Sequence, residues 1–412
     1  MLRSTGFLFG ASVVRNLGPP VVLVLVAQVL RDPTTLGRYS LALAIATPLF
    51  SFAQLGLRVV YVTLRPNAPI RDYVLVQALA LGAALAVTGV VAGAGGVLVG
   101  AGFAVTLLMV GVSKSADMFA ETLTGPLQFT ERMSRIFGAA VGTVVVTVGA
   151  TTVVMLTTTD LSWSLAAMAA AGVGATFVFM YRPVRAVGTS TGLWSDGSAT
   201  RRTVLRAGLP SGVLIAVISL VATMPQYFLT FWHGVEVAGH WLVLFYVYAL
   251  ADLATGAGVQ VWIPTARRRL ADGALRPELA RTVTRWTGAY LPGTAVGLLL
   301  ATWLLPLMFG GTYTLGLAQA VPLGLAIAAL PFAYFSQAAV SVLNRYGHGL
   351  TLSVCSTAVA FALCAILVGP FGLTGAAWAL AGAVLTRGGV ATGVVLVSHS
   401  GARQPVTDLG AR

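Results

Sequence analysis

Charged residues recur on one side of an apolar segment, at Lys114, Asp117 and Glu121. Gly125 and Gln128 continue the spacing, and on a helix all five fall within a stripe of roughly 80°. Ionisable side chains inside a membrane span cost at least ~2.5–3.5 kcal/mol each, so the stripe must face protein or water. Lys114, Asp117 and Glu121 are spaced so that they can pair along the helix, but one lysine then serves two carboxylates. The pattern predicts a cavity-lining face with a titratable or cation-binding role, or else a structural ion-pair network.

A second group lies in the first apolar segment, where Arg15-Asn16 precede Pro19-Pro20. A proline frees the carbonyl four residues before it. We therefore expect a kink beside a buried cation, which either forms part of a binding site or only accommodates packing.

Three further charges lie within apolar segments, at Arg58, Asp252 and Arg387. Arg58 lies near the end of the second segment, from where its long side chain could reach the membrane interface. Asp252 and Arg387 lie deep in the eighth and twelfth segments and could pair with each other as a structural tie. Because such groups are costly in hydrocarbon, each is also a candidate for a wet cavity.

The composition assigns the chain to the membrane. Of 412 residues, 57% are hydrophobic and only 9% are charged, and the mean hydropathy is +0.88. Soluble chains carry roughly 25% charged residues, so this chain could not cover a soluble surface. The basic residues lie in short loops without interleaved aromatics, so nucleic acid is not an expected partner. An all-α integral membrane protein is predicted.

Apolar segments predict twelve spanning helices, since one span needs roughly 20 apolar residues. Six lie near 5–30, 39–64, 73–93, 98–127, 134–157 and 161–182, and six near 204–231, 239–265, 283–309, 317–343, 349–369 and 373–398. A polar stretch separates the two sets. The chain is therefore expected to divide into a first lobe at 1–182, a cytoplasmic interlobe linker at 183–203 and a second lobe at 204–412.

The basic residues indicate an orientation. With both termini in the cytoplasm, nineteen of the 25 Lys and Arg residues, including Arg65 and Arg71, fall on the cytoplasmic side, and only Arg31 and Arg38 fall outside. Cytoplasmic loops of membrane proteins carry this excess. We expect a multi-pass protein with both termini in the cytoplasm.

The two halves also share a weak internal repeat. An offset of 202 residues pairs Gly6 with Gly208, Gly10 with Gly212 and Gly37 with Gly239. Each half has an even number of spans, so the copies share one topology and would be related by an axis along the membrane normal, as in several transporter folds.

Motifs of soluble enzymes are absent from the sequence. No G-x-x-x-x-G-K-[ST] motif occurs, so ATP hydrolysis by this chain is not expected. His233, His240, His348 and His399 are scattered, and no His/Cys cluster has metal-site spacing. We predict no metal, no cofactor and no enzymatic activity.

The ordered set of motifs resembles the oligosaccharidyl-lipid flippases, the Wzx-like polysaccharide exporters of the multidrug/oligosaccharidyl-lipid/polysaccharide (MOP) superfamily. The first hairpin, with Leu36-Gly37-Arg38-Tyr39 and Leu55-Gly56-Leu57-Arg58, is similar to the family's first two spans. The run from Lys114 to Met133 resembles the fourth-span motif of one exporter branch. Further similar stretches are Arg206–Pro210, Leu305–Gly310 and Pro370–Ala377.

This resemblance implies a MATE-like fold of two pseudo-repeated six-helix bundles that rock around a central cavity. It implies flipping of a polyprenyl-pyrophosphate-linked saccharide across a bacterial cytoplasmic membrane, among membrane lipids and other glycan-assembly membrane proteins. The candidates are Arg15, Asn16, Arg58, Lys114 and Gln128 for substrate, Asp117, Glu121 and Asp252 for coupling to a proton or sodium ion, and Pro19, Pro20 and Arg387 for structure or gating. The two carboxylates of the first lobe depart from the family's use of buried cations.

Two other functions fit less of the pattern. A cation-coupled multidrug or metabolite antiporter would have the same architecture. A membrane-embedded glycosyltransferase or polymerase would need a sizeable external loop, and the outside loops here have about ten residues or fewer.

Overall fold

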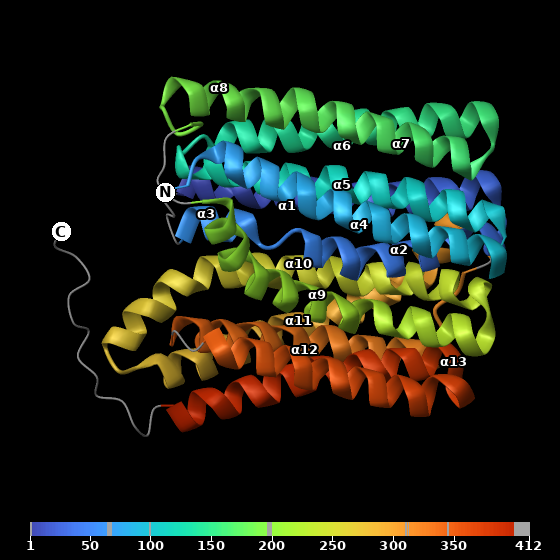
Figure 1. Ribbon diagram of the computed structural model, residues 1–412. Helices are drawn as coiled ribbons and strands as arrows, with labels where there is room; N and C mark the ends of the chain where they lie inside the picture. The colour runs from blue at the N-terminus through green and yellow to red at the C-terminus, as the bar shows by residue number, and fades with distance from the viewer. Residues whose placement is uncertain are drawn as a thin grey trace.

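The computed structural model describes residues 2–63, 68–98, 100–195, 200–309, 311, 313–343 and 346–398. Over these ranges the chain forms helices joined by short turns, and no strand occurs. The helices run side by side, with the first half of the chain above the second half in Figure 1. Of the residues discussed above, Arg65, Gly310, His399, linker residues 196–199 and the tail 399–412 lie outside the described ranges.

The first half of the chain forms the first bundle. Its elements are α1 Leu2–Leu30, α2 Pro33–Ala53, α3 Leu57–Thr63, α4 Ile70–Leu98, α5 Ala101–Phe129, α6 Met133–Thr158, α7 Leu161–Ala175, η1 Thr176–Tyr181 and α8 Arg182–Ser190. The pair α2 and α3 forms one crossing, and α7, η1 and α8 form another. The first bundle therefore has six membrane-length crossings.

The second half forms the second bundle, with α9 Arg201–His233, α10 Val235–Ala271, α11 Leu275–Met308, α12 Leu317–Val342 and α13 Tyr346–Ser398. A straight helix of 53 residues would be ~80 Å long, against a hydrocarbon core of ~30 Å. Instead α13 turns back at Gly372, where φ is 51°, and the Ser356 hydroxyl donates across the hairpin to the Ala383 carbonyl at 2.8 Å. The eleven apolar helices thus make the twelve crossings predicted.

The two ends of the molecule differ in their connections. At the short-loop end the described residues that join the crossings are 31–32, 100, 159–160, 234, 309, 311 and 313–316, together with the kink at Gly372. Asp32 begins α2 there by accepting hydrogen bonds from the Thr34 and Thr35 backbone N–H groups. The Thr35 hydroxyl also donates to this carboxylate, and these bonds hold the pKa of Asp32 below its usual value. The other end, where α8 ends at Ser190 and α9 begins at Arg201, is the linker end.

The buried core joins the bundles differently at the two ends. Near the short-loop end, one apolar cluster includes residues of both bundles, such as Leu36 and Tyr39 of α2 with Trp241 of α10. Toward the linker end, one cluster of described residues combines the first bundle with Val204 of α9, and another, around Trp262, comes from the second bundle alone. Figure 1 shows α10 bending away from the first bundle toward this end. The bundles therefore part along α10 toward the linker end, while α9 stays packed on the first bundle there.

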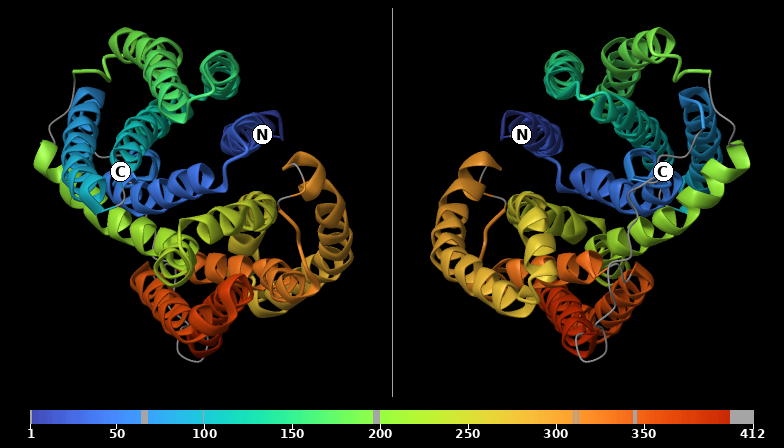
Figure 2. Two further views of the ribbon diagram at one scale, coloured as in Figure 1. Left: turned by 90° about the vertical axis from the view of Figure 1, so that its right-hand side faces the viewer. Right: turned by 90° about the vertical axis from the view of Figure 1, so that its left-hand side faces the viewer.

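The internal repeat has a structural counterpart. Gly37 and Gly239, which the offset of 202 pairs, pack backbone to backbone, and a Cβ on Gly37 would overlap the Val235 carbonyl. The Thr34 hydroxyl donates to Glu236 at 2.9 Å, again across 202 positions. Equivalent residues touch only beside the axis that relates them, so this contact marks the pseudo-twofold axis between the two bundles, which Figure 2 views along the helices.

Two local expectations change, and a third is refined. The polar stretch was expected to be a linker from residue 183, but α8 continues to Ser190, and Val184 and Val187 are buried in the first bundle. The second apolar segment was expected to be one helix, but it is interrupted between α2 and α3, where Leu55 and Gly56 adopt positive φ. The pair Pro19-Pro20, where a kink was expected, lies inside α1, which continues to Leu30.

Candidate functional site

A cavity of about 300 Å³ lies between the two bundles. We call it the interbundle cavity. Its walls are formed by α1, α2, α5, α6 and α7 of the first bundle and by α9 and α10 of the second. The predicted chamber is therefore present between the two bundles.

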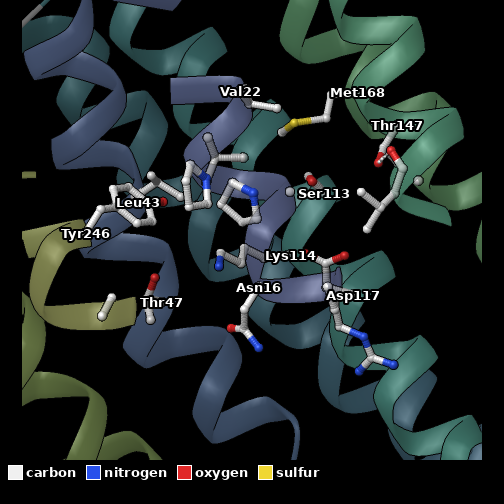
Figure 3. A pocket seen from close by; sticks show the side chains of 18 of the residues that line it. Asn16, Val22, Leu43, Thr47, Ser113, Lys114, Asp117, Thr147, Met168 and Tyr246 are labelled. Carbon is white, nitrogen blue, oxygen red and sulfur yellow. Dashed lines mark hydrogen bonds between the residues drawn. The ribbon is translucent and has the colours of Figure 1, made fainter. Parts of the chain in front are cut away.

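The first bundle supplies the charged wall. Lys114 and Asp117 on α5 line the cavity together with Arg15 and Asn16 on α1. Figure 3 shows Lys114, Asp117 and Asn16 near one another among the side chains that line this cavity. The helical spacing that predicted this stripe thus brings its first members to the cavity.

Glu121 holds the centre of an ion-pair network beside the cavity. Its carboxylate accepts hydrogen bonds from Arg15 of α1 and from Arg58 of α3, the latter at 2.5 Å. The Arg58 Nε–H also donates to the Gln128 side-chain oxygen at 3.1 Å. Three helices are tied together by this network, whose three charged members keep 19–31% of their side-chain surface accessible.

This network corrects the sequence interpretation of the stripe. Neither Lys114 nor Asp117 makes an ion pair with the other within 4.0 Å among the described residues. Two arginines that are distant in sequence satisfy Glu121 instead. Three cations now face two carboxylates, so the site carries a formal surplus of one positive charge instead of the surplus of negative charge that the stripe alone predicted. Arg58 reaches inward to Glu121 and not to the membrane interface.

The second bundle supplies a mostly apolar wall. Residues of α10 line the cavity at Leu242, Phe245, Tyr246, Ala249, Leu250 and Leu253. From α9 come Ala222, Thr223 and Gln226. Sequence reasoning missed this wall because apolar residues in a spanning helix carry no signal of their own. Gln226 did carry a signal, because it is an isolated amide in an apolar segment.

The charged residues of the second bundle do not line the cavity. Asp252 accepts a hydrogen bond from the Tyr334 hydroxyl at 2.8 Å, and the Arg387 guanidinium lies over the Tyr334 ring, 4.4 Å from its centroid. The expected direct pair of Asp252 with Arg387 is therefore replaced by a cluster in which Tyr334 stands between them. Within the described part of the chain, Arg387 Nε and Nη2 are buried without a hydrogen-bond partner.

No family model and no curated protein matches the sequence. Solved structures match over nearly its whole length. A mutant of the MATE transporter VcmN from Vibrio cholerae superposes with a TM-score of 0.63 at 14% identity, covering 98% of this chain and 97% of that chain. A MOP superfamily transporter from Pyrococcus furiosus gives 0.63 at 12%, covering 97% and 94%. The lipid II flippase MurJ, in an inward closed conformation, gives 0.67 at 12%, covering 97% and 88%. The chain therefore has the MATE-like fold of MOP superfamily transporters, as the sequence predicted.

Proposed function

We propose that this protein is an alternating-access transporter that moves a lipid carrying a pyrophosphate-linked saccharide across the membrane. The cavity supports this substrate because its two walls differ in chemistry. The first bundle presents Arg15 and Lys114, and the second presents the apolar face of α10. An anionic headgroup suits the first wall and a hydrocarbon chain suits the second. The likeness to MurJ, described as a lipid II flippase, agrees with this substrate class.

The observation that carries the proposal is the state of Lys114. Its side chain lines the cavity, and it makes no hydrogen bond or ion pair among the described residues. Arg15 and Arg58 are already held by Glu121. A cation that makes no hydrogen bond or close ion pair with the described residues is costly in a mostly apolar membrane cavity, and a phosphate group would satisfy it with charge-assisted hydrogen bonds.

The packing of the bundles supports alternating access from the linker end. The short-loop end is closed by Gly37 against Gly239 and by the buried bond from the Ser40 hydroxyl to the Ala238 carbonyl. We place the linker end in the cytoplasm of a bacterium, since most basic residues lie there. Substrate would then enter from the inner leaflet, with a proton or sodium ion coupling through Asp117.

The test is lipid flipping in liposomes. Reconstituted protein should expose a fluorescent polyprenyl-pyrophosphate saccharide to a membrane-impermeant quencher faster than empty liposomes do. Lys114→Met should slow this exchange about 10–100-fold, the equivalent of one charge-assisted contact, and Lys114→Arg should retain part of it. Ser115→Ala is the matched control, because its hydroxyl donates within α5 to Gly111. Wild-type exchange at the rate of empty liposomes would refute the proposal.

A second candidate is cation-coupled export of organic cations, favoured by one observation. Asp117 faces the cavity and makes no hydrogen bond among the described residues, so it could bind a cationic substrate when deprotonated. This function predicts proton- or sodium-driven efflux of dyes that Asp117→Asn abolishes. Efflux without lipid flipping would favour it over the main proposal.

A membrane-embedded glycosyltransferase is the least supported alternative. The described connections at the short-loop end are short, and the fold is that of transporters. We propose that the chain works beside separate glycan-assembly enzymes and is not itself one.

A further inference from the structure

We infer that Gln226 binds the saccharide part of the substrate and so makes the second bundle selective for glycan-bearing lipids. This inference rests on the proposed function and adds a recognition residue that the charged wall does not contain. It concerns the wall of the cavity opposite Lys114.

The side chain of Gln226 is open on one side only. Only 3% of the residue is accessible, and it lines the interbundle cavity. No hydrogen bond to its amide occurs within the described part of the chain, and its polar atoms are not among those enclosed without a partner. The amide is thus buried in protein on all sides except the one that faces the cavity.

Helix α9 holds this amide in place. The next residue, Tyr227, donates its hydroxyl to the Ala44 carbonyl of α2 at 2.5 Å. The preceding Pro225 is buried. The turn of α9 that carries Gln226 is therefore fixed against the first bundle, so the amide has a defined direction.

Gln226 differs from its polar neighbour Thr223 in its hydrogen bonding. Thr223 lies one turn earlier on α9 and also lines the cavity, but its hydroxyl donates to the Ser219 carbonyl at 3.2 Å. The α10 residues that line this wall offer apolar surface, except for the hydroxyl of Tyr246. Gln226 is accordingly the amide of the second bundle left for a ligand.

A sugar is the ligand group that best suits this amide. A neutral amide offers two donor and two acceptor positions, which match hydroxyl and acetamido groups of a sugar. A prenyl chain has no such groups, and pyrophosphate is better served by the cations of the opposite wall. One substrate would then touch charge in the first bundle and an amide in the second, and could draw the bundles together.

The experiment compares two probes, polyprenyl pyrophosphate and the same lipid bearing N-acetylglucosamine. Their Kd values for the purified full-length protein would be measured by tryptophan fluorescence. Gln226→Met keeps the side-chain length but removes the hydrogen bonds. It should weaken binding of the glycan-bearing probe about three- to tenfold, the equivalent of one neutral hydrogen bond, and leave polyprenyl pyrophosphate unchanged. Gln226→Asn should restore part of the preference, and Thr223→Val is the matched control.

Equal weakening of both probes, or no change in either, would overturn the role of Gln226 while the proposed function stands. Should Gln226→Met not fold, the same comparison on Gln226→Asn decides, because a shortened amide must still reduce the preference for the glycan. Wild-type protein that binds neither probe would instead defeat the proposed function itself, and Lys114→Met distinguishes the cases by losing both probes together.

Discussion

The two bundles are copies in topology but place their intramembrane charges differently. In the first bundle, Lys114 and Asp117 face the interbundle cavity, and Glu121 gathers two arginines beside it. In the second bundle, Asp252 and Arg387 are engaged with Tyr334 away from the cavity. A repeat thus preserves helix packing while its polar residues diverge, which leaves the charges of the cavity to one copy and a mostly apolar wall to the other.

Breaking the Glu121 network should have the largest effect. Glu121→Gln removes the negative charge that holds Arg15 and Arg58. We expect a stability loss of ~1–3 kcal/mol, below the figure for a fully buried pair because the network is partly accessible. Lipid exchange should fall more than tenfold, since three helices lose their common tie.

Thermal unfolding in detergent and the liposome assay measure these two effects. Glu131→Gln is the control, because Glu131 is exposed in the turn after α5. A normal melting temperature with normal lipid exchange in Glu121→Gln would show that the network does not organise the charged wall.

The contact at the pseudo-twofold axis should come next. A Cβ on Gly37 overlaps the Val235 carbonyl, whereas one on Gly239 lies 3.0 Å from the Gly37 nitrogen. Gly37→Ala should therefore open the short-loop end more than Gly239→Ala does. The reporter is Ser40→Cys, buried at this contact, in a chain whose Cys355 and Cys364 are replaced by alanine.

Labelling of this cysteine by an impermeant maleimide should rise about tenfold in Gly37→Ala, the equivalent of ~1.4 kcal/mol. Gly89→Ala is the control, since its added Cβ meets no atom within 4 Å. If Gly37→Ala, Gly239→Ala and Gly89→Ala were all labelled equally, the contact between Gly37 and Gly239 would not be what closes the short-loop end.

The sequence predicted those features that depend on length and spacing within one helix. Twelve crossings follow from apolar segments, and the cavity-facing position of Lys114 and Asp117 follows from helical periodicity. The pairing of Glu121 could not follow, because Arg15 and Arg58 are 106 and 63 residues away and no local pattern records which helices adjoin. Gln226 was missed for a related reason, since one amide has no periodicity. The end of α8 was misplaced because its polar residues conceal a buried face.

The charged cluster of the second bundle should show a smaller effect. Tyr334→Phe removes the hydroxyl that donates to Asp252 but keeps the ring beneath Arg387. We expect a stability loss of about 1–2 kcal/mol from one lost bond to a charged acceptor, with lipid exchange within twofold of wild type. A tenfold loss of exchange at unchanged melting temperature would contradict the contrast between bundles, because it would give Asp252 a direct part in transport.

The smallest effect should come from making the bundles alike where their second crossings begin. Asp32 caps α2, whereas Gly234, at the equivalent position 202 residues on, gives α10 no side-chain cap. Asp32→Gly should cost only a few tenths of a kcal/mol and Asp32→Ala about 1 kcal/mol. Because hydrogen bonds hold the pKa of Asp32 below 3.8, its contribution is complete above that pH and is lost as pH falls through the lowered pKa. The melting temperatures of wild type and Asp32→Ala should thus differ at pH 7 and converge at lower pH, and a difference that persists after protonation would assign the effect to packing rather than to the cap.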